Sequence, residues 1–436
     1  MLRRTTAVIA ALLLSTPGAG HGQQSDTTRA AAEARAAFDS VVAANTYHMS
    51  LEDGQLRGEG ARWLVERARG AHHFMIGERH GTGEIPAVAA SLYERLADVG
   101  YDYAALEIGP FAARHVNRAL DRGGFGALSD VLTRYDGAPV AFMAWREEAR
   151  MAARIAAAGG TIWGLDQEFV RSLPLHLDAL ADEAETAEER RAVRSVRDRM
   201  REEWTAGRDY LGNAEPGALE DLRAAFETRG DREALARIDA LITSNRIYAP
   251  YTRNTGSFYH SGLTRENYMK SVLVERIREA EARGDSAPRI FYKFGGLHSG
   301  KHPGAGLDQR VPLGTFVSEW ARTIRGEDSY HLFVDCNGGR HAGSGQGEAG
   351  ECSPYLTSQP AAGGETSPFA RHLSDEGITV IDLSALRDRF SDWDFLTERA
   401  RSFIIAADAY MAVAGVTPST TYERFRQEDD GSGDAP

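Results

Sequence analysis

Long hydrophobic runs are missing from most of this chain, and so are long runs of basic residues. After residue 24 no apolar stretch approaches the roughly 18 residues that a spanning helix needs, which excludes a protein with several membrane spans. The chain holds 50 Lys and Arg against 63 Asp and Glu, a formal charge of −13, which argues against nucleic acid as the main partner. It has no Gly-x-Ser-x-Gly motif and only two cysteines, so a serine or cysteine nucleophile has little support.

The first residues differ from the rest. A short basic region, MLRR, precedes an apolar stretch at residues 6–17 that ends in small residues. This order is typical of a secretory signal peptide. We expect residues 1–22 to be a signal peptide cleaved between Gly20 and Gln23, and the mature protein to be exported to the periplasm or the extracellular space. The alternative, an uncleaved membrane anchor, is disfavoured because the apolar stretch is short.

The two cysteines lie at the ends of a glycine-rich stretch. In an oxidising compartment a disulfide between Cys336 and Cys352 would close this loop and stabilise the fold by roughly 3 kcal/mol. The alternative is a zinc site formed by both cysteines with His331 or His341. We favour the disulfide, because zinc ligands are usually closer together in sequence.

Apolar strands alternate with amphipathic helices along most of the chain, and a composition of 42% hydrophobic and 26% charged residues is that of a globular protein. This alternation predicts an α/β fold with a mainly parallel sheet flanked by helices. The expected strands are 71–77, 101–109, 159–166, 289–295, 330–336 and 377–383, and the expected helices include 85–99, 111–121, 139–158 and 395–413.

The alternation stops at about residue 172, where charged segments with helical spacing of apolar residues begin and no strand is expected up to residue 247. We interpret residues 172–262 as an inserted helical subdomain that ends in an aromatic loop at 247–262, with Thr264 capping the next helix. The α/β domain would then comprise residues 23–171 and 263–425, followed by a disordered acidic tail at 426–436.

Polar residues follow four of the predicted strands. The first strand is followed by Glu78 and His80, the second ends at Glu107, the third leads to Asp166, and the strand at 289–295 leads to His298. Because the carboxyl ends of parallel strands share one edge of the sheet, where ligands bind, we expect these side chains to converge on one site.

Two kinds of chemistry suit this set of residues. A histidine oriented by a carboxylate can act as a general base, while a second histidine or Arg265 stabilises a developing oxyanion. Alternatively, His80, Glu107 and His298 bind a divalent metal whose water is the nucleophile. The residue pattern alone does not separate the two.

The same motifs resemble those of the erythromycin-esterase-like proteins and their wider relatives, the ChaN haem-binding proteins and the Tiki-type metalloproteases. The similar segments, in the order that the esterase-like family shows, are IGERHGTGEIP (76–86), ALEIGP (105–110), IWGLDQEF (162–169), TRENYM (264–269) and FGGLHSG (294–300). They span residues 70–302 and leave the segment after 330 unassigned.

The resemblance implies a hydrolase with an α/β core and a helical insert, which works without a metal. It implies that His80 is the general base, oriented by Glu78 and Glu107, and that His298 and the pair Arg265 and Glu266 also belong to the site. One spacing departs from the family: a single residue separates Glu78 from His80 where the family usually has two. In this respect the motif looks more like the ChaN proteins.

We therefore expect an exported hydrolase of a small-molecule ester or lactone, with no cofactor. Two alternatives remain open at this point: a metal-dependent hydrolase or peptidase, and a protein that binds haem or iron. The sequence does not indicate the substrate or the oligomeric state.

Overall fold

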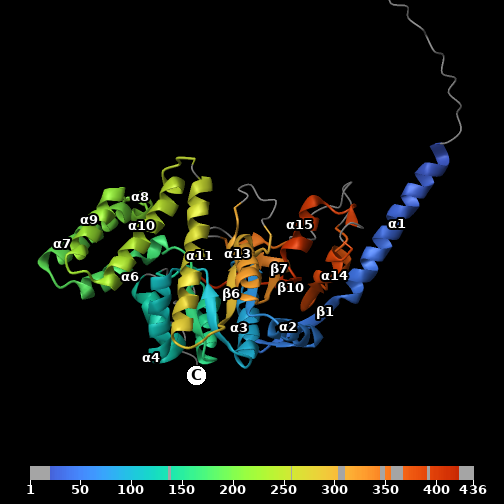
Figure 1. Ribbon diagram of the computed structural model, residues 1–436, viewed down its shortest axis with the longest axis horizontal. Coiled ribbons are helices and arrows are strands. Elements are labelled where there is room, and N and C mark those ends of the chain that lie inside the picture. The colour runs from blue at the N-terminus through green and yellow to red at the C-terminus, as the bar shows by residue number, and fades with distance from the viewer. Residues whose placement is uncertain are drawn as a thin grey trace, which may run out of the picture.

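The structure is a computed structural model that describes residues 20–135, 139–256, 258–302, 310–343, 349–354, 367–389 and 393–421 (Figure 1). The predicted signal peptide therefore lies outside the described residues except for residues 20–22, and the predicted tail at 426–436 lies outside them entirely. None of the described helices is long and apolar enough to cross a membrane.

A sheet of ten strands forms the centre of the molecule. Its strands are β1 (Thr46–Glu52), β2 (Gln55–Arg57), β3 (His73–Glu78), β4 (Tyr101–Leu106), β5 (Thr161–Gly164), β6 (Arg289–Gly295), β7 (Ser329–His341), β8 (Gly350–Glu351), β9 (Ile378–Asp382) and β10 (Ala409–Val416). They lie in the order β2-β1-β9-β10-β7-β3-β6-β4-β5, with β8 paired to β7. The six strands from β10 to β5 run parallel to one another, and β9, β1, β2 and β8 are antiparallel to their neighbours.

Helices cover both faces of this sheet, and the alternation of side chains along β3 shows how. Phe74 and Ile76 pack in one hydrophobic cluster with four helices, whereas Met75, between them, packs with two others on the opposite face. The first group of helices is α2 (Glu59–Arg69), α3 (Glu84–Ala97), α4 (Pro110–Arg134) and α5 (Arg146–Ala157); the second is α11 (Phe258–Ala282) and α13 (Leu313–Trp320). Burial of both faces explains why these strands are continuous apolar runs.

A third cluster joins the last part of the chain to the first helix. Phe38 and Val42 of α1 (Gly20–Ala44) pack with Leu386 of α14 (Ser384–Arg387) and Ile404 of α15 (Glu398–Ala406). In Figure 1 the rest of α1 projects away from the body of the protein. The remaining short helical segments are η1 (Val170–Ser172), α12 (Gly296–Ser299), η2 (Ala321–Arg325) and η3 (Ala370–His372).

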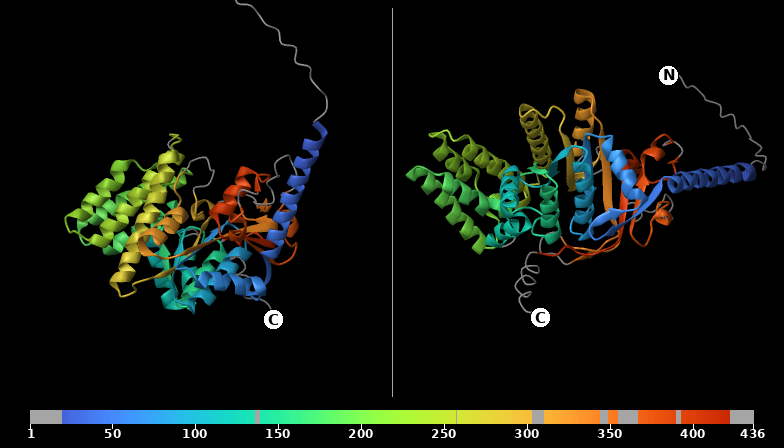
Figure 2. Two further views of the ribbon diagram at one scale, coloured as in Figure 1. Left: turned by 45° about the vertical axis from the view of Figure 1, so that its right-hand side comes forward. Right: turned by 90° about the horizontal axis from the view of Figure 1, so that it is seen from below.

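The inserted helices form a bundle at one end of the molecule, opposite α1 (Figure 2). They are α6 (Leu173–Glu183), α7 (Ala187–Thr205), α8 (Tyr210–Asn213), α9 (Pro216–Glu227) and α10 (Arg232–Thr252). Their apolar side chains share a hydrophobic cluster of their own. The predicted α/β class with a helical insert is therefore confirmed, while the exact domain boundaries stay a prediction.

Several expected elements need correction. The predicted aromatic loop at 247–262 is largely helical, because α10 continues to Thr252 and α11 already begins at Phe258, six residues before the expected cap at Thr264. The predicted helix at 139–158 begins only at Arg146. The predicted helix at 395–413 is the helix α15 followed by the strand β10, whose apolar run is buried between β7 and β9. A short apolar run fits a buried strand as well as a helix.

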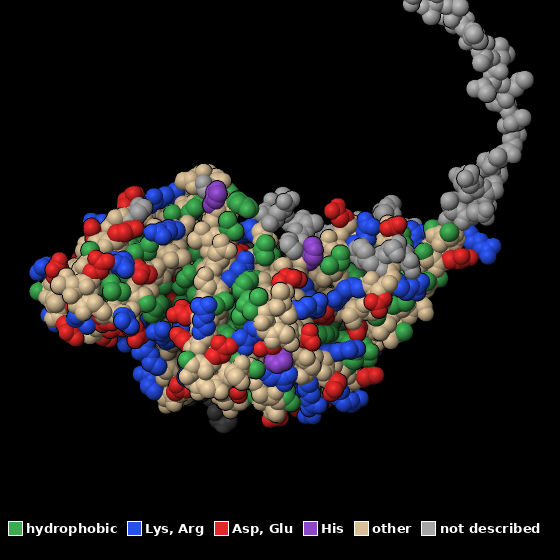
Figure 3. Space-filling view, viewed as in Figure 1, with side chains coloured by type: hydrophobic (Ala, Val, Ile, Leu, Met, Phe, Trp, Pro, Cys, Tyr) green, Lys and Arg blue, Asp and Glu red, His purple; other side chains and the backbone are tan. Residues whose placement is uncertain are grey.

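The face of the molecule shown in Figure 3 carries acidic and basic side chains side by side. No large region of one sign stands out on this face, so it offers no basic stripe of the kind that tracks a nucleic acid backbone.

Candidate active site

Four parallel strands deliver the predicted site residues to the same edge of the sheet. Neighbouring strands β3, β6, β4 and β5 end there, and the chain turns to the other side of β3 when it continues into β7. Such a reversal of strand order opens a crevice at the carboxyl ends of the strands. Glu78 is the last residue of β3, Glu107 follows β4 directly, Asp166 follows β5 after one residue, and His298 lies in α12 just after β6.

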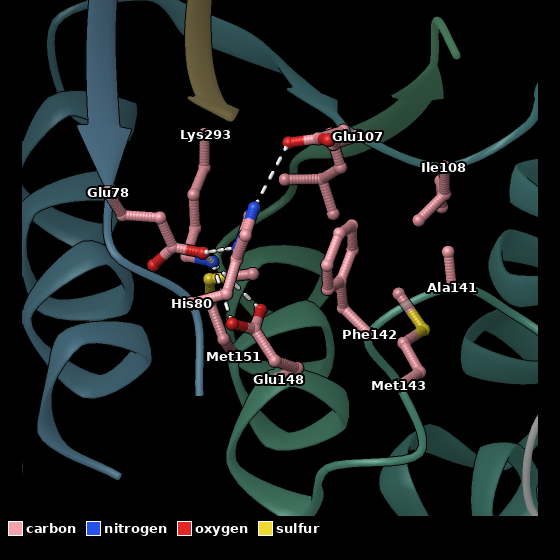
Figure 4. A pocket seen from close by; sticks show the side chains of 11 residues that line it. Glu78, His80, Glu107, Ile108, Ala141, Phe142, Met143, Glu148, Met151 and Lys293 are labelled. Carbon is pink, nitrogen blue, oxygen red and sulfur yellow. Dashed lines mark hydrogen bonds and ion pairs between the residues drawn. The ribbon is translucent and has the colours of Figure 1, made fainter. Parts of the chain in front are cut away.

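His80 is held between two glutamates (Figure 4). Its Nδ1 donates a hydrogen bond of 2.8 Å to Oε1 of Glu78, and its Nε2 lies 3.5 Å from Oε2 of Glu107. The His80 side chain is 29% exposed, whereas both glutamates are buried. Gly295 makes this approach feasible, because a Cβ atom there would lie only 2.7 Å from Nε2 of His80.

Glu107 is the centre of the site. One oxygen accepts a hydrogen bond of 2.6 Å from the Gly295 amide, and the other accepts one of 2.8 Å from Arg265 and lies 3.6 Å from Nε2 of His298. Burial opposes ionisation of this carboxyl, but the charge of His298, the hydrogen bond to His80 and the charge of Arg265 hold its pKa well below the usual range. Glu107 is therefore a carboxylate at neutral pH.

His298 is oriented in the same way as His80. Its Nδ1 donates a hydrogen bond of 2.6 Å to Oε1 of Glu266, and the other oxygen of Glu266 accepts the backbone N–H of Leu313 at 2.9 Å. His298 and Glu266 are both buried. The site thus contains two carboxylate–histidine pairs whose Nε2 atoms both face Glu107.

Arg265 connects Asp166, the last of the predicted residues, to Glu107. It lies in the second turn of α11 and contacts both oxygens of Asp166, with Nε to Oδ1 at 3.0 Å, while also reaching Glu107. Burial opposes its charge, but Asp166 and Glu107 raise the pKa of Arg265 well above its ordinary value. All seven predicted residues therefore lie in one connected network, and their catalytic roles stay a prediction.

The protonation of His80 follows from its neighbours. Burial alone would lower its pKa, but the hydrogen bonds and negative charges of Glu107 and Glu78 outweigh that cost and raise the pKa of His80 to about 10. The ring is therefore an imidazolium at neutral pH, and both of its nitrogens carry protons directed at carboxylates.

Three residues that the sequence analysis missed also belong to this site. Lys293, on β6, donates to Oε1 of Glu78 and to both oxygens of Glu148, at 2.7 and 3.0 Å. Phe142 stacks on the His80 ring with the ring centroids 4.3 Å apart. The sequence does contain a signal for Lys293, because it lies inside the apolar run RIFYKFG. A buried strand tolerates a lysine only when the charge is paired.

A small cavity adjoins His80. One wall is charged and the other apolar, as Figure 4 shows. It is lined by Glu78, His80, Leu106, Glu107, Ile108, Ala141, Phe142, Met143, Glu148, Met151 and Lys293. Its volume is about 10 Å³, which is close to the minimum for one water molecule.

The alternative metal ligands do not fit a single ion as they are arranged. The two histidine Nε2 atoms approach different oxygens of Glu107, at 3.5 and 3.6 Å. Atoms bound to one zinc ion lie at most about 4.6 Å apart. In the part of the chain that the structure describes, His80, Glu107 and His298 do not form a group whose ligand atoms all lie within 4.8 Å of one another.

The cysteines form the expected disulfide, with their Cα atoms 6.0 Å apart. Within the described ranges, the one group of three ligand atoms at metal-like spacing is Asp335 with these two cysteines, and neither His331 nor His341 belongs to it. The zinc alternative for the cysteines is therefore not supported. Next to the bridge, the Ala342 amide donates to the Gly81 carbonyl at 2.7 Å and so ties this loop to the residue after His80.

Comparison with known proteins shows the fold. No family model matches the chain, and neither does any curated protein sequence. Among solved structures, it resembles a histidine-to-asparagine variant of the erythromycin esterase EreC in its open conformation, with a TM-score of 0.57 and 13% identity over 86% of this chain and 99% of that one.

Two further structures are similar. A succinoglycan biosynthesis protein has a TM-score of 0.57 and 14% identity, covering 89% of this chain and 98% of that one. A protein from Bacillus cereus has a TM-score of 0.54 and 14% identity, covering 91% and 99%. The expected resemblance to the erythromycin esterases is thus confirmed in structure, and this chain shares their fold.

Proposed function

We propose that this chain is an exported hydrolase that cleaves an ester or a lactone with a water molecule activated by His80. The observation that carries the proposal is the pair of carboxylate-bound histidines, His80 and His298, whose Nε2 atoms both face Glu107. When a histidine whose Nδ1 donates to a carboxylate is neutral, its lone pair lies on Nε2 and can accept a proton, which is the arrangement that general acid–base catalysis uses.

The reaction requires the neutral form of His80, which is the minor form at neutral pH because the pKa of His80 is raised to about 10. The proton stays on Nδ1, which donates it in the hydrogen bond to Glu78, so the lone pair is on Nε2. His80 lines a cavity whose volume is close to that of one water molecule. Nε2 takes a proton from that water, and the hydroxide adds to the carbonyl carbon of the substrate. When the tetrahedral intermediate collapses, the C–O bond to the leaving group breaks and His80 returns its proton to the leaving oxygen, which yields an acid and an alcohol.

The negative charge on the tetrahedral intermediate needs donors. His298 presents Nε2 on the other side of Glu107, and the Arg265 guanidinium, which is 26% exposed, lies next to the same carboxylate. A hydrogen bond to a carboxylate fixes each of them: His298 donates to Glu266, and Arg265 donates to Asp166. Donors that are fixed before the reaction stabilise an oxyanion without reorganisation.

The experiment that tests the proposal is a screen of the purified mature chain against p-nitrophenyl esters and a panel of lactones. Each assay is run with and without a chelator, and the metal content of the protein is measured. We expect hydrolysis of at least one class of substrate, unchanged by the chelator. Absence of hydrolysis across the panel would contradict the proposal.

The same preparation decides between the alternatives. Loss of activity with the chelator and recovery with a divalent ion would identify a metal-dependent hydrolase or peptidase. A haem absorption band, in the purified protein or after titration with haem, would identify a haem-binding protein. The ligand spacing argues against the metal-dependent outcome.

Export is supported by the basic and apolar N-terminal sequence and by the disulfide, which forms in oxidising compartments. Expression of the full chain in a bacterial host, followed by N-terminal sequencing of the exported form, tests it. We expect the mature chain to begin within residues 21–23.

A further inference from the structure

Lys293 occupies a position in which a charged side chain is costly. It lies in the interior of β6, where it pairs with Ile76 of β3 and Leu106 of β4, and only 5% of it is exposed. A buried ammonium group is tolerated only when it is paired and hydrogen-bonded. Lys293 therefore reflects a specific arrangement rather than ordinary packing of a strand.

Its three N–H donors are all used inside the protein. One goes to Oε1 of Glu78, and the other two go to the two oxygens of Glu148, at 2.7 and 3.0 Å. No donor is left for a substrate, so Lys293 acts on the site only through its partners.

One of those partners is the carboxylate that orients His80. Oε1 of Glu78 accepts from both Lys293 Nζ and His80 Nδ1, as Figure 4 shows. Although burial disfavours the charged form of Glu78, the charge of Lys293 and the hydrogen bond to His80 lower its pKa. Glu78 therefore stays an acceptor, which is the state that keeps a proton on Nδ1 of His80.

Glu148 holds Lys293 from the opposite side. It lies in the first turn of α5, is 4% exposed and lines the cavity beside His80. The preceding residues of α5 are fixed as well, because the Arg146 amide donates to the Thr420 carbonyl and Glu147 accepts from the Thr420 amide. A series of contacts thus links the helix α5 to the proposed base. It runs from Glu148 to Lys293, then to Glu78, and then to His80.

We propose that Lys293 and Glu148 are positioning residues that fix the His80 ring through Glu78. The inference rests on the proposed function in that it names what holds the proposed base. It assigns no direct contact with the substrate to either residue.

The competing explanation is a buried ion pair that only stabilises the core, and a double variant separates the two. Lys293→Met alone leaves Glu148 buried without its cation and removes the same cation from Glu78, so it lowers stability as well as activity. Lys293→Met combined with Glu148→Leu removes the pair and fills its place with apolar groups, a change that often restores stability.

We expect the double variant to recover most of the melting temperature that Lys293→Met loses and yet to keep kcat about 100-fold below wild type, because a misplaced base loses activity on that scale. The substrate for this assay is p-nitrophenyl butyrate or the best compound of the ester and lactone screen. A double variant with wild-type stability and wild-type kcat would overturn the proposal.

A second readout needs no turnover, so it separates this proposal from the proposed function. In proton NMR of the wild type we expect a low-field signal from the Nδ1 proton of His80, identified by its absence in His80→Asn, and we expect that signal to be lost in the double variant. Persistence of the signal in the double variant would overturn the proposal, whether or not the protein hydrolyses esters.

The matched control is another ion pair on the same helix. Arg154 of α5 contacts Glu94 of α3 through two hydrogen bonds of 2.7 and 2.8 Å and does not line the cavity. The double variant Arg154→Met with Glu94→Leu should leave kcat and the His80 signal unchanged. Loss of either in this control would mean that removal of any ion pair of α5 disturbs the site, which would also count against a specific role for Lys293.

Discussion

Phe142 stacks almost parallel on the ring of His80, with an angle of 20° between the two planes and 4.3 Å between the centroids. It does so from a backbone conformation that is rare for any residue except glycine, with φ at +61°. Left-handed backbone in a bulky residue persists only where the surroundings enforce it, and it is common at functional sites. Phe142 thus restrains the free side of the His80 ring while Glu78 and Glu107 hold its nitrogens.

The left-handed conformation of Phe142 gives a prediction about stability. Glycine adopts φ near +61° without strain, whereas alanine retains a cost of roughly 1–2 kcal/mol. Phe142→Gly should therefore be more stable than Phe142→Ala by about 1 kcal/mol, measured as the free energy of unfolding in urea. Both should lose activity relative to Phe142→Tyr, which keeps the stacked ring. Equal stability of the glycine and alanine variants would show that this backbone conformation is not enforced.

The raised pKa of His80 predicts how activity depends on pH. A general base works in its neutral form, and with a pKa of about 10 that form increases tenfold with each pH unit from 7 towards 10. We expect kcat/KM to rise along this limb and to level off near pH 10. A profile that is flat between pH 7 and pH 9 would contradict a base with this pKa.

Glu107→Gln should shift the pH range over which kcat/KM rises, which is the limb described above. Glu107 contributes to the raised pKa of His80 through its charge and its hydrogen bond, so a neutral side chain there lowers the pKa of His80 and shifts the limb to lower pH. Glutamine retains an oxygen that can accept from the Gly295 amide. The raised pKa also makes the stability of the wild type depend on pH. The stabilisation that charged His80 gives the folded protein is complete below pH 6.5 and is lost as the pH rises through about 10. A limb at unchanged pH in Glu107→Gln would show that Glu107 does not set this pKa.

His298 should contribute to the rate without setting the pH limb. Removal of one donor to a developing oxyanion typically costs 10²- to 10³-fold in kcat. We expect a loss of that size in His298→Ala, measured at the pH optimum, with the alkaline limb at its wild-type position. Glu266→Gln, which keeps one of the two acceptor oxygens that His298 and the Leu313 amide use, serves as the milder control. Wild-type kcat in His298→Ala would remove this histidine from the mechanism.

The disulfide should stabilise the fold measurably. Cys336 and Cys352 are 16 residues apart, and for a loop of this length the entropic contribution is about 3 kcal/mol. Replacement of both cysteines with serine should lower the free energy of unfolding by roughly that amount, and a reductant should have the same effect on the wild type but none on the variant. A wild type that is insensitive to reductant would contradict this role.

The parallel direction of the central strands was predictable, because strands that alternate with helices along the chain form parallel sheets. Once the sheet is parallel, the residues after each strand must meet at one edge, and for this reason Glu78, Glu107, Asp166 and His298 could be grouped from the sequence alone. The sequence could not indicate which oxygen faces which nitrogen. That detail depends on the register of β3, β6 and β4 and on the position of α11.

What the sequence analysis missed has physical reasons. Strand β10 overlaps the helix predicted at 395–413, because the run AYMAVAGV has no charged side chain to show a period. Glu148 lies in an ordinary charged first turn of a helix, and only the fold brings it to Lys293. Phe142 does not directly follow a strand. Its position over His80 depends on its positive φ angle, which the neighbouring residues in the sequence do not indicate.

The most direct test of the account is the activity of His80→Asn on an ester or lactone that the wild type hydrolyses. The matched control is His48→Asn, an exposed histidine on β1, four strands away from β3 in the sheet. We predict that His80→Asn keeps the circular dichroism and melting behaviour of a folded protein and loses at least 10³-fold in kcat, while His48→Asn is unchanged. A folded His80→Asn protein with kcat close to that of the wild type would contradict the central claim that His80 activates the water.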